Sequence, residues 1–167
     1  QNFSATVFDL APVAMWLEDF SGVKEQFELW RTEGVTDLRA HLLADIRRVE
    51  TCSQKIRVLA VNAKTLELFE AQSFEALVGG LSNVFRDEML ESHVNELLAL
   101  WEGKNEFSGT AVNYTLAGRR LDIQLRGIIL PGHETSWNRL LLTTEDVTAR
   151  EEARRQEERQ RRYAEGM

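Results

Sequence analysis

Side chains that often carry chemistry are few in this sequence, and they are spread far apart. Cys52 is the only cysteine, so the chain can form no internal disulfide, and no spacing of cysteine and histidine suggests a zinc site. His41, His93 and His133 stand alone, and neither a glycine-rich phosphate loop nor a G-x-S-x-G nucleophile motif occurs. The sequence therefore predicts no metal centre and no nucleophilic catalytic residues.

One acidic residue falls within a predicted strand and has to be weighed as a general base. A small α+β cavity enzyme, such as an isomerase or dehydratase, needs an aspartate or histidine inside its cavity. Asp122 alternates with the apolar residues Leu121 and Ile123, which places it on the solvent face of its strand. This placement argues against the cavity enzyme, which we keep as an alternative.

The composition is that of a soluble globular protein with an acidic surface. Hydrophobic residues make up 43% and charged residues 28% of the 167 residues, and the net charge is −7. Phosphate binding needs a basic surface, so this charge argues against nucleic acid as a partner. No apolar run approaches the ~20 residues of a membrane span, which predicts a cytoplasmic domain without direct membrane insertion. A membrane anchor elsewhere in the parent protein stays open.

The elements that must position any site alternate between strands and helices. We expect a strand over 12–19, two helices within 22–51, a buried strand over 55–62, short helices over 63–70 and 74–78, a long helix over 90–101, and three antiparallel strands after it. In the first hairpin of these last strands, alternation favours Val112 and Tyr114 for the buried face and Asn113 and Thr115 for the other. This order predicts an α+β fold with a five-stranded antiparallel sheet that helices cover on one face.

Four segments resemble a PAS sensor domain in their order and spacing: FDLAPVAMWLEDF (8–20), VLAVNAKTLELFEA (58–71), TLAGRRLDIQL (115–125) and TTEDVTARE (143–151). The helical insert over 22–51 resembles an extended variant found in bacterial multidomain signalling proteins, which include histidine kinases and diguanylate cyclases. The resemblance implies a sensor domain over 1–148. A coiled-coil linker would then start within 149–167 and lead to an effector domain in the same chain.

The resemblance also implies where a signal would pass and where a ligand would lie. The junction Asp146-Val147-Thr148 looks like the Asp-Ile-Thr motif through which PAS domains continue into the next element, and the Asp146 carboxylate would cap the helix that follows. The cavity would be lined by Trp16, Asn62, Phe69, Phe85, Trp101, Tyr114 and Ile123. For the aromatic side chains in this set, ordinary core packing is the alternative.

No motif names a haem, a flavin or a metabolite, so the identity of any ligand stays open. Haem-binding PAS sensors use a histidine on the helix that corresponds to the one carrying His93 here. The apolar spacing of this helix predicts instead that His93 lies at the boundary or the surface. Flavin-binding relatives carry a thiol in an Asn-Cys-Arg-type motif, which the surroundings of Cys52 do not match. We therefore expect Cys52 to be buried and structural, and His41 and His133 to be solvated.

The C-terminal stretch is polar but has a regular pattern. Uncharged residues recur at spacings of four and three, as in the a and d positions of a heptad repeat, and we call them the seam: Ala149, Ala153, Gln156, Gln160, Tyr163 and Met167. Ion pairs spaced four apart, such as Glu151–Arg155 and Glu158–Arg162, support a helix. Two alanines and two glutamines make the seam weak, which predicts a marginal coiled coil in a homodimer. A solvated single helix is the alternative.

The sequence thus predicts a non-catalytic sensory module in two-component or cyclic-di-GMP signalling. The module would bind a small ligand, form a homodimer, or both, and it would transmit a conformational change through its C-terminal helix to the downstream effector. A pure oligomerisation module without a ligand is a further alternative.

Overall fold

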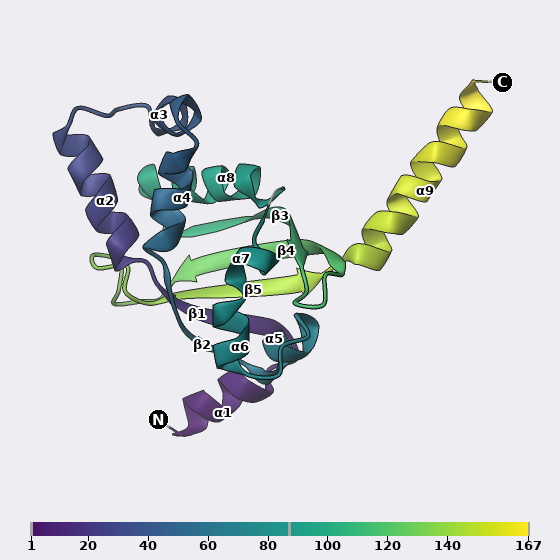
Figure 1. Cartoon of the computed structure of the whole chain (residues 1–167), viewed down its shortest axis with the longest axis horizontal. Helices are drawn as coiled ribbons and strands as arrows, with labels where there is room; N and C mark the ends of the chain where they lie inside the picture. Colours follow the sequence, from purple (N-terminus) through teal and green to yellow (C-terminus); the bar gives the residue numbers. More distant parts are fainter. Residues whose placement is uncertain (1, 87, 167) are drawn as a thin grey trace.

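A five-stranded antiparallel sheet forms the centre of the molecule (Figure 1). The computed structural model describes residues 2–86 and 88–166. The strands are β1 (Ala14–Asp19), β2 (Arg57–Val61), β3 (Glu106–Tyr114), β4 (Arg120–Ile129) and β5 (Leu140–Asp146). Their order in the sheet is β2-β1-β5-β4-β3, and each neighbouring pair is antiparallel. The predicted α+β architecture is confirmed.

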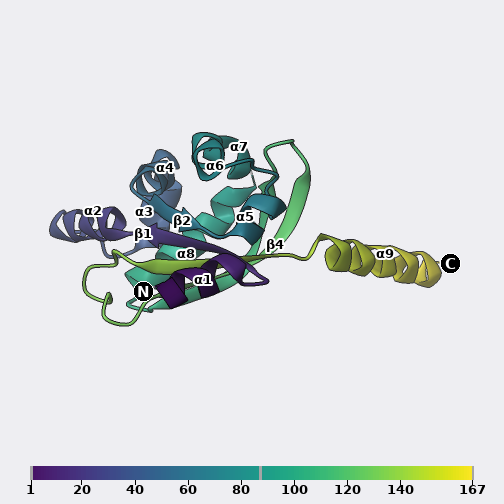
Figure 2. The same ribbon diagram turned by 90° about the horizontal axis from the view of Figure 1, so that it is seen from below.

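Helices precede β1, fill the connections from β1 to β2 and from β2 to β3, and follow β5. They are α1 (Asn2–Leu10), α2 (Ser21–Thr32), α3 (Leu38–Ala44), α4 (Arg47–Gln54), α5 (Ala63–Leu68), α6 (Phe74–Gly79), α7 (Leu81–Val84), α8 (Met89–Trp101) and α9 (Thr148–Glu165). The insert helices and α5–α7 lie on one side of the sheet, and α9 projects from the body (Figure 2). The sequence patterns did not predict α1 or α7. None of the described helices is long and apolar enough to span a bilayer.

The insert between β1 and β2 contains three helices instead of the two predicted. The expected second helix breaks at Asp45, whose backbone is extended (φ −151°, ψ 102°) and whose carboxylate accepts a hydrogen bond from the Arg47 N–H at 3.2 Å. The extended backbone at Asp45 ends α3, and α4 begins two residues later at Arg47. The insert is also joined to the body, because the Phe27 ring packs edge-on against Trp101 and Trp137 with centroids 5.2 and 5.8 Å apart.

The hairpin of β3 and β4 forms as predicted, but β3 turns the opposite face to the core. Asn113 and Thr115 are each 1% exposed, whereas Val112 and Tyr114 lie on the outer face and are only half-buried. Residues directly opposite each other in an antiparallel pair share a face, and Asn113 lies opposite the fully buried Leu121. The prediction that Val112 and Tyr114 mark the inner face of β3 is therefore wrong, and the inward apolar residues of this strand are Phe107 and Ala111.

Two other expectations about burial are also wrong. Asp122 lies on the outer face of β4 but is only 8% exposed, because the start of α9 covers it. The strand β2, expected to be buried on both faces, is half-exposed because it is an edge strand that pairs only with β1. Its run of apolar residues reflects partial burial beside α6 rather than a central place in the sheet.

Candidate functional site

A cavity of about 570 Å³ lies between the inner face of the sheet and helices α4, α7 and α8. Much of its wall is apolar and includes Phe20, Val49, Val58, Phe85, Leu125 and Leu142. Small-molecule sites are commonly mostly apolar cavities of roughly 300–1,000 Å³ with a few polar groups. The insert contributes through α4, so the insert forms part of the candidate site.

Two buried glutamates line this cavity. Glu18 occupies an inward position of β1 and is 5% exposed, and Glu96 lies on the buried face of α8 and is 9% exposed. Burial, together with the negative charge of Glu96, raises the pKa of Glu18 to about 8. Burial also raises the pKa of Glu96 to about 7, although the Ser92 hydroxyl donates a hydrogen bond to its carboxylate at 3.0 Å and opposes the rise.

Two further polar residues of the cavity wall complete the candidate site. The Asn113 amide donates from Nδ2 to the Val112 carbonyl (3.0 Å) and approaches the Met89 sulfur (3.2 Å), while its Oδ1 has no partner among the described residues. His93 lines the wall as well, and desolvation lowers its pKa to about 4, so that it is neutral at pH 7. His93 is half-buried, which agrees with the predicted boundary position, and this position places it on the cavity wall.

The residues predicted to line the cavity are spread over several environments. Phe85 lines it, but Trp16 and Phe69 are fully buried in the core and pack edge-on against each other at 5.3 Å. Trp101 packs in the aromatic cluster with Phe27, on the other side of α8. Core packing therefore accounts for these three aromatic side chains.

The other predicted cavity residues have structural contacts of their own. Asn62 is fully buried and caps α5, where it also binds the backbone around β1. Tyr114 points outward and donates a hydrogen bond to Glu88 at 2.6 Å. Ile123 lies on the wall of a second, more polar depression of about 700 Å³ that follows β3. We take the smaller cavity as the candidate site, because its apolar wall is better suited to hold a small molecule.

The cysteine and the other two histidines pack within the fold and do not line the candidate cavity. Cys52 is fully buried, as expected, and burial raises the pKa of its thiol to about 12. His41 and His133 are not freely solvated: His41 packs edge-on against Trp30 at 4.8 Å, and His133 Nδ1 lies 2.6 Å from Asn138 Oδ1. No group of three or more His, Cys, Asp or Glu side chains that could hold a metal occurs in the described part of the chain.

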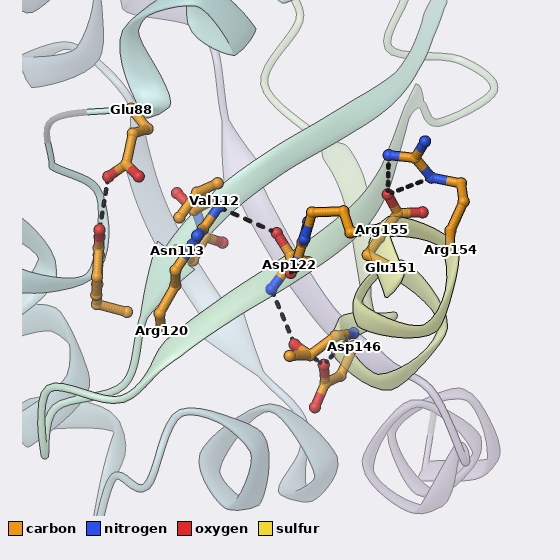
Figure 3. Close-up of polar contacts among 11 residues, drawn as sticks. Glu88, Val112, Asn113, Arg120, Asp122, Asp146, Glu151, Arg154 and Arg155 are labelled. Carbon is orange, nitrogen blue, oxygen red and sulfur yellow. Dashed lines mark hydrogen bonds and ion pairs between the residues drawn. The ribbon is translucent and has the colours of Figure 1, made fainter. Parts of the chain in front are cut away.

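Asp122 connects the body to the start of α9 (Figure 3). Its N–H donates to the Thr148 hydroxyl at 2.9 Å, and its carbonyl accepts from the Val147 N–H at 2.8 Å. Its carboxylate accepts from Arg155 on the second turn of α9 at 3.2 Å. The Asp146 carboxylate in turn accepts from the Thr148 N–H (3.0 Å) and hydroxyl (2.6 Å). The predicted junction residues therefore lie together, and Asp122 is a member that alternation alone did not identify.

The helix α9 has no buried residue in the described part of the chain. The described seam residues are exposed, with Tyr163 73% exposed, and Met167 lies outside the described residues. Glu158 pairs with Arg162 as predicted, at 3.7 Å. Glu151 pairs with Arg154 instead of Arg155, because Arg155 reaches back to Asp122.

Comparisons with known proteins identify the fold. Neither a protein-family model nor a curated protein matches the sequence. A PAS domain of a protein from Colwellia psychrerythraea matches at 13% identity and a TM-score of 0.57, covering 89% of this chain and 97% of that chain. A domain of a sensory box sensor histidine kinase/response regulator from Geobacter sulfurreducens matches at 15% identity and a TM-score of 0.51, covering 87% and 92%. The LOV domain of a blue-light activated histidine kinase from Erythrobacter litoralis matches at 10% identity and a TM-score of 0.52, covering 81% and 95%. This chain thus has the fold shared by PAS and LOV domains, as the resemblance implied.

Proposed function

We propose that this chain is a non-catalytic sensory module of a cytoplasmic signalling protein. It binds a small ligand in the cavity, forms a homodimer through α9, and passes a conformational bias through Asp146-Val147-Thr148. The receiving effector is of the histidine kinase or diguanylate cyclase type. Two of the similar structures are named as parts of histidine kinases, which supports a signalling role.

The observation that carries this proposal is that the strands lining the cavity also hold α9. Leu125 of β4 and Thr144 of β5 face the cavity, and the same strands carry Asp122 and Asp146 at the junction. A ligand that shifts these strands therefore acts on α9 through a short, hydrogen-bonded path. Transmission requires two arrangements of similar free energy, and the weak seam of α9 is suited to this.

The direct test is to identify what the cavity holds and whether α9 responds. Native mass spectrometry and an absorption spectrum of the purified chain report a retained ligand. Distances between spin labels on α9 and β5, measured with and without that ligand, report the response. Sensory function predicts a ligand-dependent shift in these distances, whereas unchanged distances at saturating ligand would contradict the proposal.

Removing the Thr148 hydroxyl is expected to loosen the start of α9. Thr148→Val keeps the shape of the side chain but leaves the Asp122 N–H without its acceptor and removes one hydrogen bond to Asp146. A lost helix-start interaction of this kind costs about 1 kcal/mol, which corresponds to roughly fivefold faster amide exchange in the first turns of α9. Hydrogen exchange measured by mass spectrometry checks this result.

Thr143→Val is the matched control, because Thr143 lies on the outer side of β5 and makes only a 3.5 Å hydrogen bond to the Arg126 carbonyl. Exchange in α9 should be unchanged in this variant. Equal exchange in both variants and the parent would mean that the hydroxyl of Thr148 does not hold the junction.

A small cavity enzyme remains the second candidate, because the cavity contains Glu18, Glu96 and His93, which include groups able to act as a general base. The retained molecule separates the two functions. A sensor returns an added ligand unchanged after long incubation, whereas an enzyme converts it and loses this conversion in Glu96→Gln.

A further inference from the structure

The cavity contains hydrogen-bond acceptors that lack a positive partner. The carboxyl groups of Glu18 and Glu96 both line it, and no basic side chain among the described residues is a cause of either pKa shift. The third acceptor is Asn113 Oδ1, which is buried and has no hydrogen-bond partner among the residues that the structure describes. Its orientation is fixed, because Nδ2 is already committed to the Val112 carbonyl. A buried acceptor without a donor destabilises the folded protein unless something else supplies the donor.

Among the described residues, the cavity wall supplies no buried basic side chain to pair with these carboxyl groups. Arg86 is the one basic side chain on the wall among the described residues, but it is exposed and its guanidinium stacks on the Tyr114 ring at 3.9 Å. His93 is neutral at pH 7 and supplies no positive charge. Two buried carboxyl groups and a free amide oxygen thus form a site for a group that is positively charged and carries several N–H donors.

We propose that the ligand of the cavity is a small organic cation, an amine or amidine joined to an apolar group, held through its N–H groups by Glu18, Glu96 and Asn113. This inference rests on the proposed sensory function and names the chemical class of its ligand. The apolar part of the ligand packs against Val49, Phe85 and Leu142.

A metal ion fits this site less well than an organic cation. Hard cations such as Ca²⁺ take about six or more oxygen ligands, and Mg²⁺ usually keeps several waters. No cluster of three or more potential metal ligands occurs among the described residues, and much of the wall is apolar. The cavity of about 570 Å³ has room for a ring or short chain in addition to the charged group.

Binding of such a cation is coupled to proton release. Glu18, with a pKa of about 8, is mostly protonated at pH 7, and Glu96, with a pKa of about 7, is about half protonated. A bound cation favours the ionised carboxylates, so that binding at pH 7 releases about one proton or more. The other charged or titratable groups on the wall are His93, Glu50 and Arg86. His93 is neutral throughout this range, so affinity for the cation should rise between pH 6 and pH 8.

Pairs of cations and neutral compounds of the same shape test this inference. The pairs are benzamidine with benzamide, 2-phenylethylamine with 2-phenylethanol, and cyclohexylmethylamine with cyclohexylmethanol. Isothermal titration at pH 7.5 should show at least one cation binding tenfold or more tightly than its neutral partner. The preference should fall about tenfold in Glu18→Gln and in Glu96→Gln, and it should persist in Glu145→Gln, which alters an exposed residue of β5.

Titrations in buffers of different ionisation enthalpy provide a second readout that does not depend on the variants. They should report protons released on binding, and this release should be smaller in Glu18→Gln. The inference is overturned if no cation binds more tightly than its neutral partner, or if the preference survives in both glutamine variants.

The class of the ligand and the sensory function can fail separately. A neutral or anionic molecule retained in the cavity would overturn the cationic class while leaving the sensory function intact. A cation that binds with the expected selectivity but does not change the distances between α9 and β5 would support the ligand class and contradict the sensory function.

Discussion

The Glu18→Gln variant is expected to be more stable than the parent chain by about 3–5 kcal/mol at pH 9, and by less than about 1 kcal/mol at pH 5. Glu18 has a pKa of about 8 in the folded protein and an ordinary value of 4.5 when unfolded. Between these values the folded state binds more protons than the unfolded state, so the free energy of unfolding falls as the pH rises from 4.5 through 8. Glutamine keeps the shape without the ionisation and avoids this loss. Urea unfolding at both pH values measures the difference.

The matched control for this prediction is Glu145→Gln on an exposed position of β5. Its effect on the free energy of unfolding should be within about 0.5 kcal/mol at both pH values, as is usual for surface substitutions. The stability effect of Glu18→Gln could instead be as independent of pH as that of Glu145→Gln. The carboxyl group of Glu18 would then not be desolvated in the folded chain, and the cavity would contain no unpaired acid at this position.

This stability difference bears on why the two glutamates are present. A glutamine or an apolar residue at position 18 would give a more stable domain at neutral and alkaline pH, so Glu18 lowers stability where it stands. Groups that destabilise a fold and have strongly shifted pKa values are concentrated at functional sites. Glu18 and Glu96 also come from different elements, a strand and a helix, and meet only in the cavity. Binding of a cation would explain why two buried acids that destabilise the fold meet in the cavity.

The order of strands and helices was predictable because hydrophobic periodicity marks elements directly. The hairpin and the long helix α8 appear where the sequence places them. The face of β3 was not predictable, because the polar residue Asn113 takes an inward position. The register of the hairpin decides this face, because it sets Asn113 opposite the fully buried Leu121.

Part of the candidate site is encoded in local sequence spacing. In β1, Ala14, Trp16 and Glu18 alternate on one face, so that a glutamate shares the face of a buried tryptophan. On α8, His93 and Glu96 follow Met89 at spacings of four and three and therefore lie on one stripe. These spacings signal an inward acid, but only the fold brings β1 and α8 together.

At the junction, the sequence pattern predicts the correct strand face for Asp122 but not its burial. Alternation correctly placed Asp122 on the outer face of β4, and a strand face that is outward in a bare sheet is usually solvated. Here α9 leaves the sheet across that face, and Arg155 of α9 binds the Asp122 carboxylate. Burial of Asp122 follows from the direction of α9, which no local pattern encodes.

The Asn62→Ala variant is expected to be less stable than the parent by about 3–4 kcal/mol, because one fully buried amide joins three segments. Its Oδ1 accepts from the Met15 N–H (2.9 Å) and the Thr65 N–H (3.1 Å), which ties β1 to the start of α5. Its Nδ2 donates to the carbonyls of Phe8 (3.0 Å) and Val13 (2.9 Å), which holds the end of α1. Alanine satisfies none of these groups, and each unpaired buried group costs about 1–3 kcal/mol, partly offset where water enters.

Ser73→Ala is the control that distinguishes the loss of the Asn62 network from the loss of an ordinary helix cap. Ser73 caps α6 with one hydrogen bond, from the Ala76 N–H at 3.1 Å, and its replacement should cost only about 1 kcal/mol. Urea unfolding should therefore rank the two variants clearly, and hydrogen exchange should rise in α1 and the start of α5 for Asn62→Ala alone. Equal destabilisation would reduce Asn62 to a helix cap. A larger loss of stability in Asn62→Ala would instead show that Asn62 binds α1 to the sheet, beside the strand that carries Glu18.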